Sequence, residues 1–395
     1  MIAGQLPDVQ KAIRGEELDG WLFCNFHHRD RLADELLGIP EGAANSRLWI
    51  YAIPAEGGPL GILHVIEPDS LGDLPGKRVF YRNREELLAR LAPLAGKRWG
   101  AHLSETLPVI SYLDGGTAAL LEGQGLDLVS AGGLIQRFRG LLDGADTAAH
   151  ERAAAHLYEM VKIAWDRVRE GRDGGRTPSE GEIRDLFLGE FERRGLIYDH
   201  PPIVAAGANS ANPHYDFSGP GAAFREGDLV QFDLWAREKG PGGIYADISW
   251  AGFYGAEVPA PMAAAFQDLV GAREGAFRYI AEEMAAGRKL RGADVDRKTI
   301  EILSALGYAG AIRHRTGHGI DREVHGSGVN MDSAEFPDSR FLLEGSCFSL
   351  EPGIYFDGFG MRTEIDVYIK DGGPVISGGE RQFALLDCAP RGQRA

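Results

Sequence analysis

Strand-like and helix-like patterns alternate in the first third of the chain. Short apolar runs rich in β-forming residues occur at 20–26 (GWLFCNF), 48–54 (LWIYAIP) and 58–66 (GPLGILHVI). A helical pattern follows at 84–96 (REELLARLAPLAG). Alternation of this kind predicts a small α/β domain. Since the apolar pattern breaks at 141–146 (LLDGAD), we assign this domain to residues 1–145.

The remaining residues, 146–395, combine longer helices with alternating strands. Helices are predicted at 147–170, 260–286 and 294–306, the last one stopped by Gly307. Another helix is predicted to start at Thr177-Pro178-Ser179-Glu180, which reads as a capping box with proline at the first helical position. The strands around these helices carry the polar residues that indicate chemistry.

Composition and charge exclude several classes of protein. The chain has 42 basic and 58 acidic residues, a net charge of −16, which argues against nucleic acid or an anionic membrane as the main partner. Three widely separated cysteines without a CxxC pair imply neither a disulfide framework nor a thiolate zinc site. No stretch approaches the ~18 apolar residues of a membrane span, and the N-terminus lacks the apolar region of a signal peptide. We therefore expect a soluble, cytoplasmic protein.

The first candidate hairpin carries two aspartates. Segments 229–236 (LVQFDLWA) and 244–253 (IYADISWAGF) both alternate with period two, and REKGPGG between them is a turn sequence. A loop centred on Gly240 would place Asp233 opposite Asp247 on one face, about 5 Å apart at Cβ.

The second candidate hairpin carries two glutamates. Segments 347–351 (CFSLE) and 361–369 (MRTEIDVYI) flank Asp357-Gly358, a strong signal for a tight turn. Centring the hairpin there places Glu351 opposite Glu364, with Arg362 and Asp366 on the side of Glu364. Pro352-Gly353 is expected to introduce a bulge.

Two like-charged pairs across hairpins require an explanation, because directly opposed like charges destabilise a sheet. Either all four carboxylates point into water, where repulsion is screened, or the pairs converge on divalent cations. Carboxylates with imidazole and without thiolate suit Mn²⁺, Co²⁺, Zn²⁺ or Fe²⁺, and four carboxylates balance two such ions. His318 within RTGHGI is the available imidazole, and its flanking glycines allow close backbone approach.

The order and local signatures of seven residues resemble the M24 metallopeptidases, a family with the "pita-bread" catalytic fold. These residues are His214 (NPHYD), Asp233 (VQFDLWA), Asp247 (IYADISW), His318 (TGHGI), His325, Glu351 (SLEPGIY) and Glu364 (MRTEID). The resemblance covers about residues 146–390, and the N-terminal segment resembles the extra domain of the creatinase, prolidase and aminopeptidase P branch. It implies an α/β, creatinase-like N-terminal domain followed by an α+β pita-bread domain.

The resemblance also implies a ligand set for two divalent metal ions, Mn²⁺ in the first place, with Co²⁺ or Zn²⁺ as alternatives. Asp233 would chelate one metal, Asp247 and Glu364 would bridge both, and His318 and Glu351 would complete the second. In such sites a bridging water or hydroxide is the nucleophile.

The remaining roles follow from the same resemblance. Glu351 would also shuttle the proton to the leaving nitrogen, His214 and His325 would contact substrate and intermediate, and Arg362 corresponds to the arginine beside the last glutamate. The sequence departs from the family pattern at two places, which concern the pocket around the leaving residue. The 14-residue spacing from Asp233 to Asp247 is long, and the His-acidic pair of the family is His325-Gly326 here. His27 and His28 match no motif and are expected to be structural.

The complete ligand set argues against a binding-only descendant of the fold. The resemblance, together with the compact chain, favours an Xaa-Pro dipeptidase that acts on Xaa-Pro dipeptides or short peptides, and it implies a homodimer. The first alternative is aminopeptidase P, which releases the N-terminal residue of longer Xaa-Pro peptides; the others are a non-hydrolytic peptide-binding module and a metal-dependent lyase. A dipeptidase must bind the free carboxylate of its substrate, for which Arg29, Arg31 and Arg47 are candidates from this subunit or a dimer partner.

Overall fold

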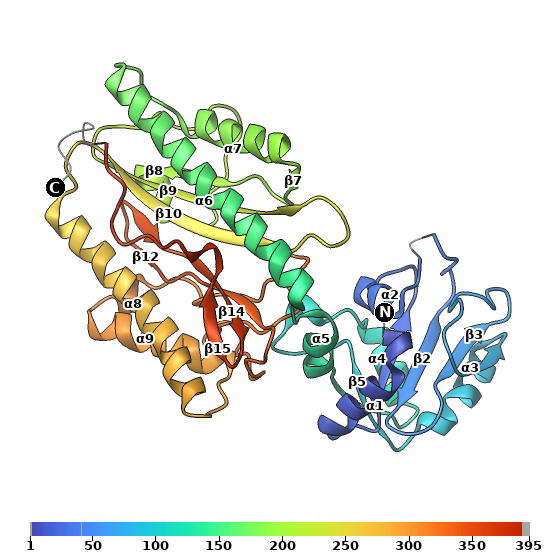
Figure 1. The fold of residues 1–395 in the computed structure, drawn as a ribbon. Coiled ribbons are helices and arrows are strands. Elements are labelled where there is room, and N and C mark those ends of the chain that lie inside the picture. Colours follow the sequence, from blue (N-terminus) through green and yellow to red (C-terminus); the bar gives the residue numbers. More distant parts are fainter. Residues whose placement is uncertain (1, 41, 389–395) are drawn as a thin grey trace. The chain divides into compact units, whose positions relative to one another are not determined.

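The computed structural model describes residues 2–40 and 42–388. The chain folds as two compact units, Met1–Arg139 and Gly140–Ala395 (Figure 1). Residues 145 and 146, between which the domain boundary was expected, lie in the first turn of helix α6 (Gly144–Asp173).

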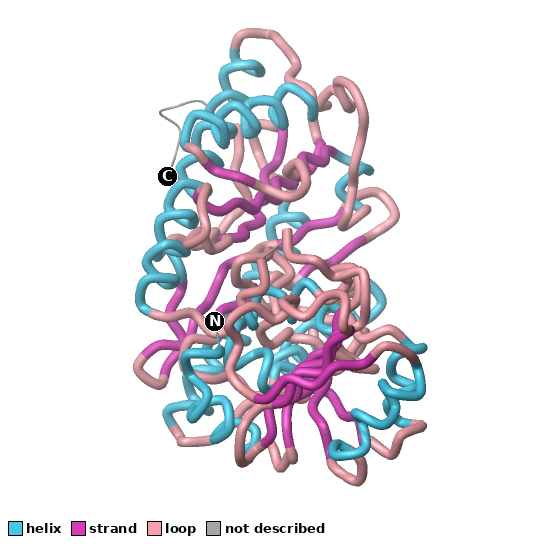
Figure 2. Tube along the Cα trace, turned by 90° about the vertical axis from the view of Figure 1, so that its right-hand side faces the viewer, coloured by secondary structure: helices cyan, strands magenta, loops and turns pink. Residues whose placement is uncertain are grey.

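A six-stranded sheet forms the N-terminal unit, and Figure 2 shows its strands side by side with helices on both flanks. Its strand order is β4-β3-β2-β1-β5-β6, with β1 at Gly20–Asn25, β2 at Trp49–Pro54, β3 at Leu60–His64, β4 at Lys77–Tyr81, β5 at Arg98–Ala101 and β6 at Asp127–Ser130. The helices are α1 (Leu6–Gly15), α2 (Arg31–Leu37), α3 (Arg84–Leu91), α4 (Gly115–Glu122) and α5 (Gly132–Arg139). Alternate residues of β1 enter two apolar clusters, Trp21 and Phe23 in one and Leu22 and Cys24 in the other. The strand is therefore buried on both faces, as its continuous apolar run requires.

The C-terminal unit contains four long helices: α6, α7 (Glu180–Arg194), α8 (Ala260–Ala285) and α9 (Gly292–Ala305). All four were expected from the sequence, but α7 begins later than predicted. Its N-cap is Ser179, whose Oγ accepts a hydrogen bond from Glu182 N at 3.2 Å. Pro178 O accepts from Phe224 N, so the residue before the cap belongs to an extended segment.

Three sheets pack among these helices. The first has the order β10-β9-β7, with β8 also paired to β9, and its strands are β7 (Leu196–Ile197), β8 (Ile203–Ala206), β9 (Asp228–Glu238) and β10 (Ala246–Tyr254). The second has the order β11 (Cys347–Leu350), β14 (Ile365–Lys370) and β15 (Gly373–Ile376), and the third pairs β12 (Gly353–Tyr355) with β13 (Gly360–Arg362). Helix α6 packs across β9 and β10, while α8 packs on β11 and β15.

The register of the β9–β10 hairpin differs from the prediction. Asp233 pairs with Ser249 and Asp247 pairs with Trp235, so the two aspartates are diagonal neighbours and do not face each other. The expected register was wrong by two residues because the loop is not symmetric: the end of β9 pairs with β7, and Tyr245 N donates to Asp321 O. An offset of two keeps both aspartates on one face of the sheet.

The second hairpin keeps the predicted register throughout. Leu350 pairs with Ile365 and Gly353 pairs with Arg362, so the offset is the same before and after Pro352. The expected bulge was wrong: the ladder is only interrupted, which leaves Glu351 and Glu364 outside any strand. Both glutamates thus lie where two short sheets meet.

Among the described residues, no helix is both long and apolar enough to cross a bilayer.

Candidate metal centre

Three buried side chains from different segments meet in the C-terminal unit. Asp247 lies on β10, His318 on the loop before β11, and Glu364 between β13 and β14. One ligand atom from each lies within 4.8 Å of the others. His318 Nε2 is 3.5 Å from Asp247 Oδ2 and 3.4 Å from Glu351 Oε1, which brings a fourth candidate residue to the group.

The electrostatics of this group favour a cation. Asp247 Oδ1 and Glu364 Oε1 are buried and accept no hydrogen bond from the described residues. Burial, followed by repulsion from neighbouring carboxylates, raises the pKa of both Asp247 and Glu364 well above the ordinary range. Burial also lowers the pKa of His318, which keeps the imidazole neutral, the form that binds metals. These donors fit a hard or borderline divalent ion.

Asp233 lies beside this group but is engaged differently. Its Oδ2 accepts a charge-assisted hydrogen bond from Arg362 Nη2, and its Oδ1 accepts one from Ser249 Oγ at 2.7 Å. Arg362 Nε donates to Ser249 Oγ at 2.9 Å and lies 3.7 Å from Glu351 Oε2. The guanidinium therefore connects Asp233 to Glu351 at the edge of the group.

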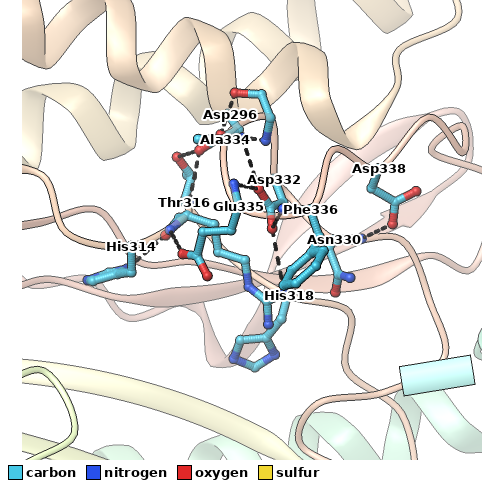
Figure 3. Close-up of polar contacts among 12 residues, drawn as sticks. Asp296, His314, Thr316, His318, Asn330, Asp332, Ala334, Glu335, Phe336 and Asp338 are labelled. Atoms are coloured by element: carbon cyan, nitrogen blue, oxygen red, sulfur yellow. Dashed lines mark hydrogen bonds and ion pairs between the residues drawn. The ribbon is translucent and has the colours of Figure 1, made fainter. Parts of the chain in front are cut away.

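The segment that carries His318 is fixed by hydrogen bonds from its backbone and from the Thr316 hydroxyl (Figure 3). Thr316 N and Oγ1 both donate to Asp296 Oδ1, at 2.9 and 2.6 Å, and Gly319 N donates to Asn330 Oδ1 at 3.0 Å. A Cβ on Gly317 would lie 2.0 Å from Ser349 O, so only glycine allows the segment to approach β11 this closely.

The two histidines expected to contact substrate are both exposed. The His325 ring lies 4.3 Å from the His318 ring at 74°. Repulsion from His318, with His214 among the smaller causes, lowers the pKa of His325. His214 N donates to Asn212 Oδ1, and among the described contacts none joins the His214 side chain directly to the group of Asp247, His318 and Glu364.

Three polar residues around the group were not predicted to have a role. Ser349 Oγ accepts from His318 N at 3.0 Å and donates to Glu351 Oε1 at 3.2 Å, Ser249 holds Asp233, and Asp366 Oδ2 accepts from Asp247 N at 2.7 Å. Their sequence signal is a spacing of two residues from a predicted ligand: Ser349 from Glu351, Ser249 from Asp247, and Asp366 from Glu364.

Comparison with known proteins identifies the class. Residues 145–371, more than half of the chain, match the model of metallopeptidase family M24. The chain is therefore a metallopeptidase by class, and it belongs to family M24.

Sequence similarity to individual relatives extends over longer stretches of the chain. The chain is 26% identical over 338 residues to a protein named probable dipeptidase PepE from Mycobacterium bovis, covering 83% of each chain. It is 36% identical over 263 residues to a protein named Xaa-Pro dipeptidase from Lactobacillus delbrueckii subsp. lactis, covering 62% of this chain and 65% of the relative. Among solved structures, dipeptidase PepE from Mycobacterium ulcerans superposes with a TM-score of 0.72 at 21% identity over 98% of both chains. The predicted family, the peptidase class and the architecture of an α/β domain followed by a pita-bread domain are confirmed.

Proposed function

We propose that this chain is a dinuclear-metal hydrolase that cleaves the Xaa-Pro bond of dipeptides. The observation that carries the proposal is the buried group of Asp247, His318 and Glu364, in which two carboxylate oxygens have no donor among the residues that the structure describes. The names of the relatives, probable dipeptidase and Xaa-Pro dipeptidase, support the choice of substrate.

Five residues would hold the two cations, for which Mn²⁺ is the first expectation: Asp233, Asp247, His318, Glu351 and Glu364. When bound, divalent cations in such a site activate water and polarise the scissile carbonyl. The buried, repelling carboxylates supply the negative charge that two cations would neutralise.

The protein's own residues would do the remaining work. Glu351, within reach of His318 and held by Ser349 Oγ, would carry the proton from the attacking water to the leaving nitrogen. Arg362 would keep Asp233 and Glu351 in place through its contacts to both. His214 and His325, both exposed, would contact the substrate.

Hydrolysis of matched peptides tests the proposal. Manganese-loaded protein should cleave an Xaa-Pro dipeptide faster than an Xaa-Pro-Xaa tripeptide or an Xaa-Ala dipeptide, and Glu351→Gln should reduce turnover at least ~100-fold. Faster cleavage of the tripeptide would identify aminopeptidase P and reject the dipeptidase. Bound metal without hydrolysis of any of these peptides would instead favour the lyase or the binding module.

Two expectations stay predictions: that an arginine of the N-terminal unit binds the substrate carboxylate, and that the protein is a homodimer. In the N-terminal unit, Arg31 Nε donates to Tyr112 OH at 3.0 Å and the Arg29 guanidinium lies over the Phe26 ring at 5.1 Å. Arg47 Nη1 donates to Ser46 O at 2.8 Å. Each arginine can be replaced by glutamine in turn. The variant that lacks the carboxylate-binding arginine should have a raised KM for the dipeptide, and the other two variants should not.

A further inference from the structure

Glu180 is a fully buried carboxylate that the proposed chemistry does not use. It is the first residue of α7 and is 0% exposed. An ionised carboxylate accepts hydrogen bonds and donates none, so a buried one is stable only where several donors converge.

Four donors converge on Glu180. Its Oε1 accepts from Ala206 N at 2.9 Å and from Asn209 Nδ2 at 2.8 Å. Its Oε2 accepts from Tyr215 OH at 3.0 Å and from Ala222 N at 2.7 Å. All four donors belong to the segment 206–222, which we call the His214 segment because it carries His214.

A second side chain of α7 holds the same segment one turn later. Arg184 Nη1 donates to Phe217 O at 2.8 Å and Arg184 Nη2 to Gly219 O at 3.4 Å. The Arg184 guanidinium lies 4.0 Å from the centre of the Phe217 ring, which stacks on Tyr215 at 5.6 Å. The residue directly after His214 is therefore fixed both by its hydroxyl and by its ring.

The His214 segment is also tied to the hairpin that precedes Glu364. Ser210 Oγ accepts from Gly360 N at 3.1 Å, and β13 continues from Gly360 to Arg362. The segment thus lies between α7, where Glu180 and Arg184 hold it, and the strand that carries Arg362.

We propose that Glu180 is a positioning residue that fixes the His214 segment and so presents His214 to the peptide. The substrate contact of His214 rests on the proposed function, whereas the ordering of the segment does not. Glutamine cannot replace Glu180, because its NH₂ group would face either Ala206 N or Ala222 N, and neither backbone donor can become an acceptor.

Steady-state kinetics of a double-variant cycle test the functional part. Glu180→Gln should lower kcat/KM for the Xaa-Pro dipeptide about tenfold or more while Mn²⁺ affinity stays within about twofold of wild type. In a His214→Ala background the same substitution should have little further effect, because Glu180 acts through His214. An equal loss of kcat/KM in both backgrounds would overturn the proposal.

Matched variants separate positioning from general damage. Glu192→Gln makes the same charge change at an exposed position of α7 and should leave kcat/KM unchanged. Glu180→Asp keeps the charge and should restore part of the loss. If Glu180→Gln does not fold, Tyr215→Phe removes one of the four donors and should give a smaller loss in the same direction; an unchanged kcat/KM in that variant would count against the proposal.

Hydrogen exchange tests the ordering of the segment without reference to activity. Glu180→Gln should speed exchange of the Ala206 and Ala222 amides about tenfold or more, while amides of β10 exchange as in wild type. This result would stand even if the wild type hydrolysed no Xaa-Pro peptide, in which case only the proposed function would fail. Unchanged exchange at both amides would overturn the positioning role.

Discussion

At the residue scale, unsatisfied carboxylate oxygens gather in one place. Asp247 Oδ1, Glu364 Oε1 and Asp366 Oδ1 are buried without a hydrogen-bond partner among the described residues. By contrast, Glu180 and Asp296, both fully buried, each accept four hydrogen bonds. The chain therefore satisfies buried carboxylates elsewhere, and the exceptions mark the candidate metal centre.

His314 is predicted to make the folding stability of the C-terminal unit sensitive to acid. Its ring nitrogens contact Arg315 O at 2.7 Å and Tyr355 OH at 2.8 Å, and burial, followed by the charge of Arg362, lowers its pKa from 6.5 to about 4. Between pH 6.5 and 4, His314 is therefore protonated in the unfolded chain but neutral in the folded chain. The stability contributed by neutral His314 is thus present above pH 6.5 and is lost as the pH falls toward 4.

Urea unfolding at pH 7.5 and pH 5 measures this effect. We expect His314→Phe to lose about 2 kcal/mol less than wild type between these two pH values. The matched variant His200→Phe, at an exposed histidine, should lose as much as wild type. Equal losses in His314→Phe and wild type would contradict the assignment.

At the residue scale, the sequence singled out three side chains that the structure brings together, but it did not single out the residues that hold them in place. His318 and Glu364 are identified by short local signatures, and the structure brings them together with Asp247. Glu180 has no such signature and Ser249 shows only strand alternation, because their partners are far away in the chain: Ala222 for Glu180 and Arg362 for Ser249. Only the folded chain shows those contacts.

At the element scale, the close approach of two backbones fixes His318. Gly317→Ala would place a methyl group against Ser349 O on β11, which neither backbone can avoid without shifting. We expect a loss of at least about 3 kcal/mol in the free energy of unfolding and weaker Mn²⁺ binding. Thermal unfolding with and without Mn²⁺ measures both.

Gly310→Ala is the control for this substitution. Nothing lies within 4 Å of a Cβ at Gly310, so the melting temperature should stay within about 1 °C of wild type. A Gly317→Ala variant as stable as Gly310→Ala would contradict the close packing of these segments.

Elements were easier to predict than their registers. The helices at 260–286 and 294–306 match α8 and α9 closely, since apolar periodicity and stop signals are local. The β9–β10 register was wrong because it depends on β7 and on Asp321, which the hairpin sequence does not contain. The β12–β13 register was right because the Asp357-Gly358 turn is short and self-contained.

At the scale of the whole molecule, metal binding concerns only one of the two units. All five proposed ligands belong to Gly140–Ala395. A cation that binds only the folded state stabilises it, so chelation should abolish activity and lower the melting temperature of this unit by about 5–10 °C. Hydrogen exchange of the full chain during heating should show earlier opening of β10 and β14, with β1 and β2 unchanged.

A mock-treated sample, passed through the same steps without chelator, controls for handling. Re-addition of Mn²⁺ should restore both the melting temperature and the activity. An unchanged melting temperature after verified removal of metal would contradict a clustered site.

The central claim is that the two hairpins and His318 enclose a pair of divalent cations. Anomalous diffraction from crystals grown with Mn²⁺ tests it most directly. We predict two neighbouring manganese peaks, both in contact with the carboxylates of Asp247 and Glu364, and their loss in crystals of Asp247→Asn. Crystals with no manganese between these side chains, or with the carboxylates turned away from each other, would contradict the claim.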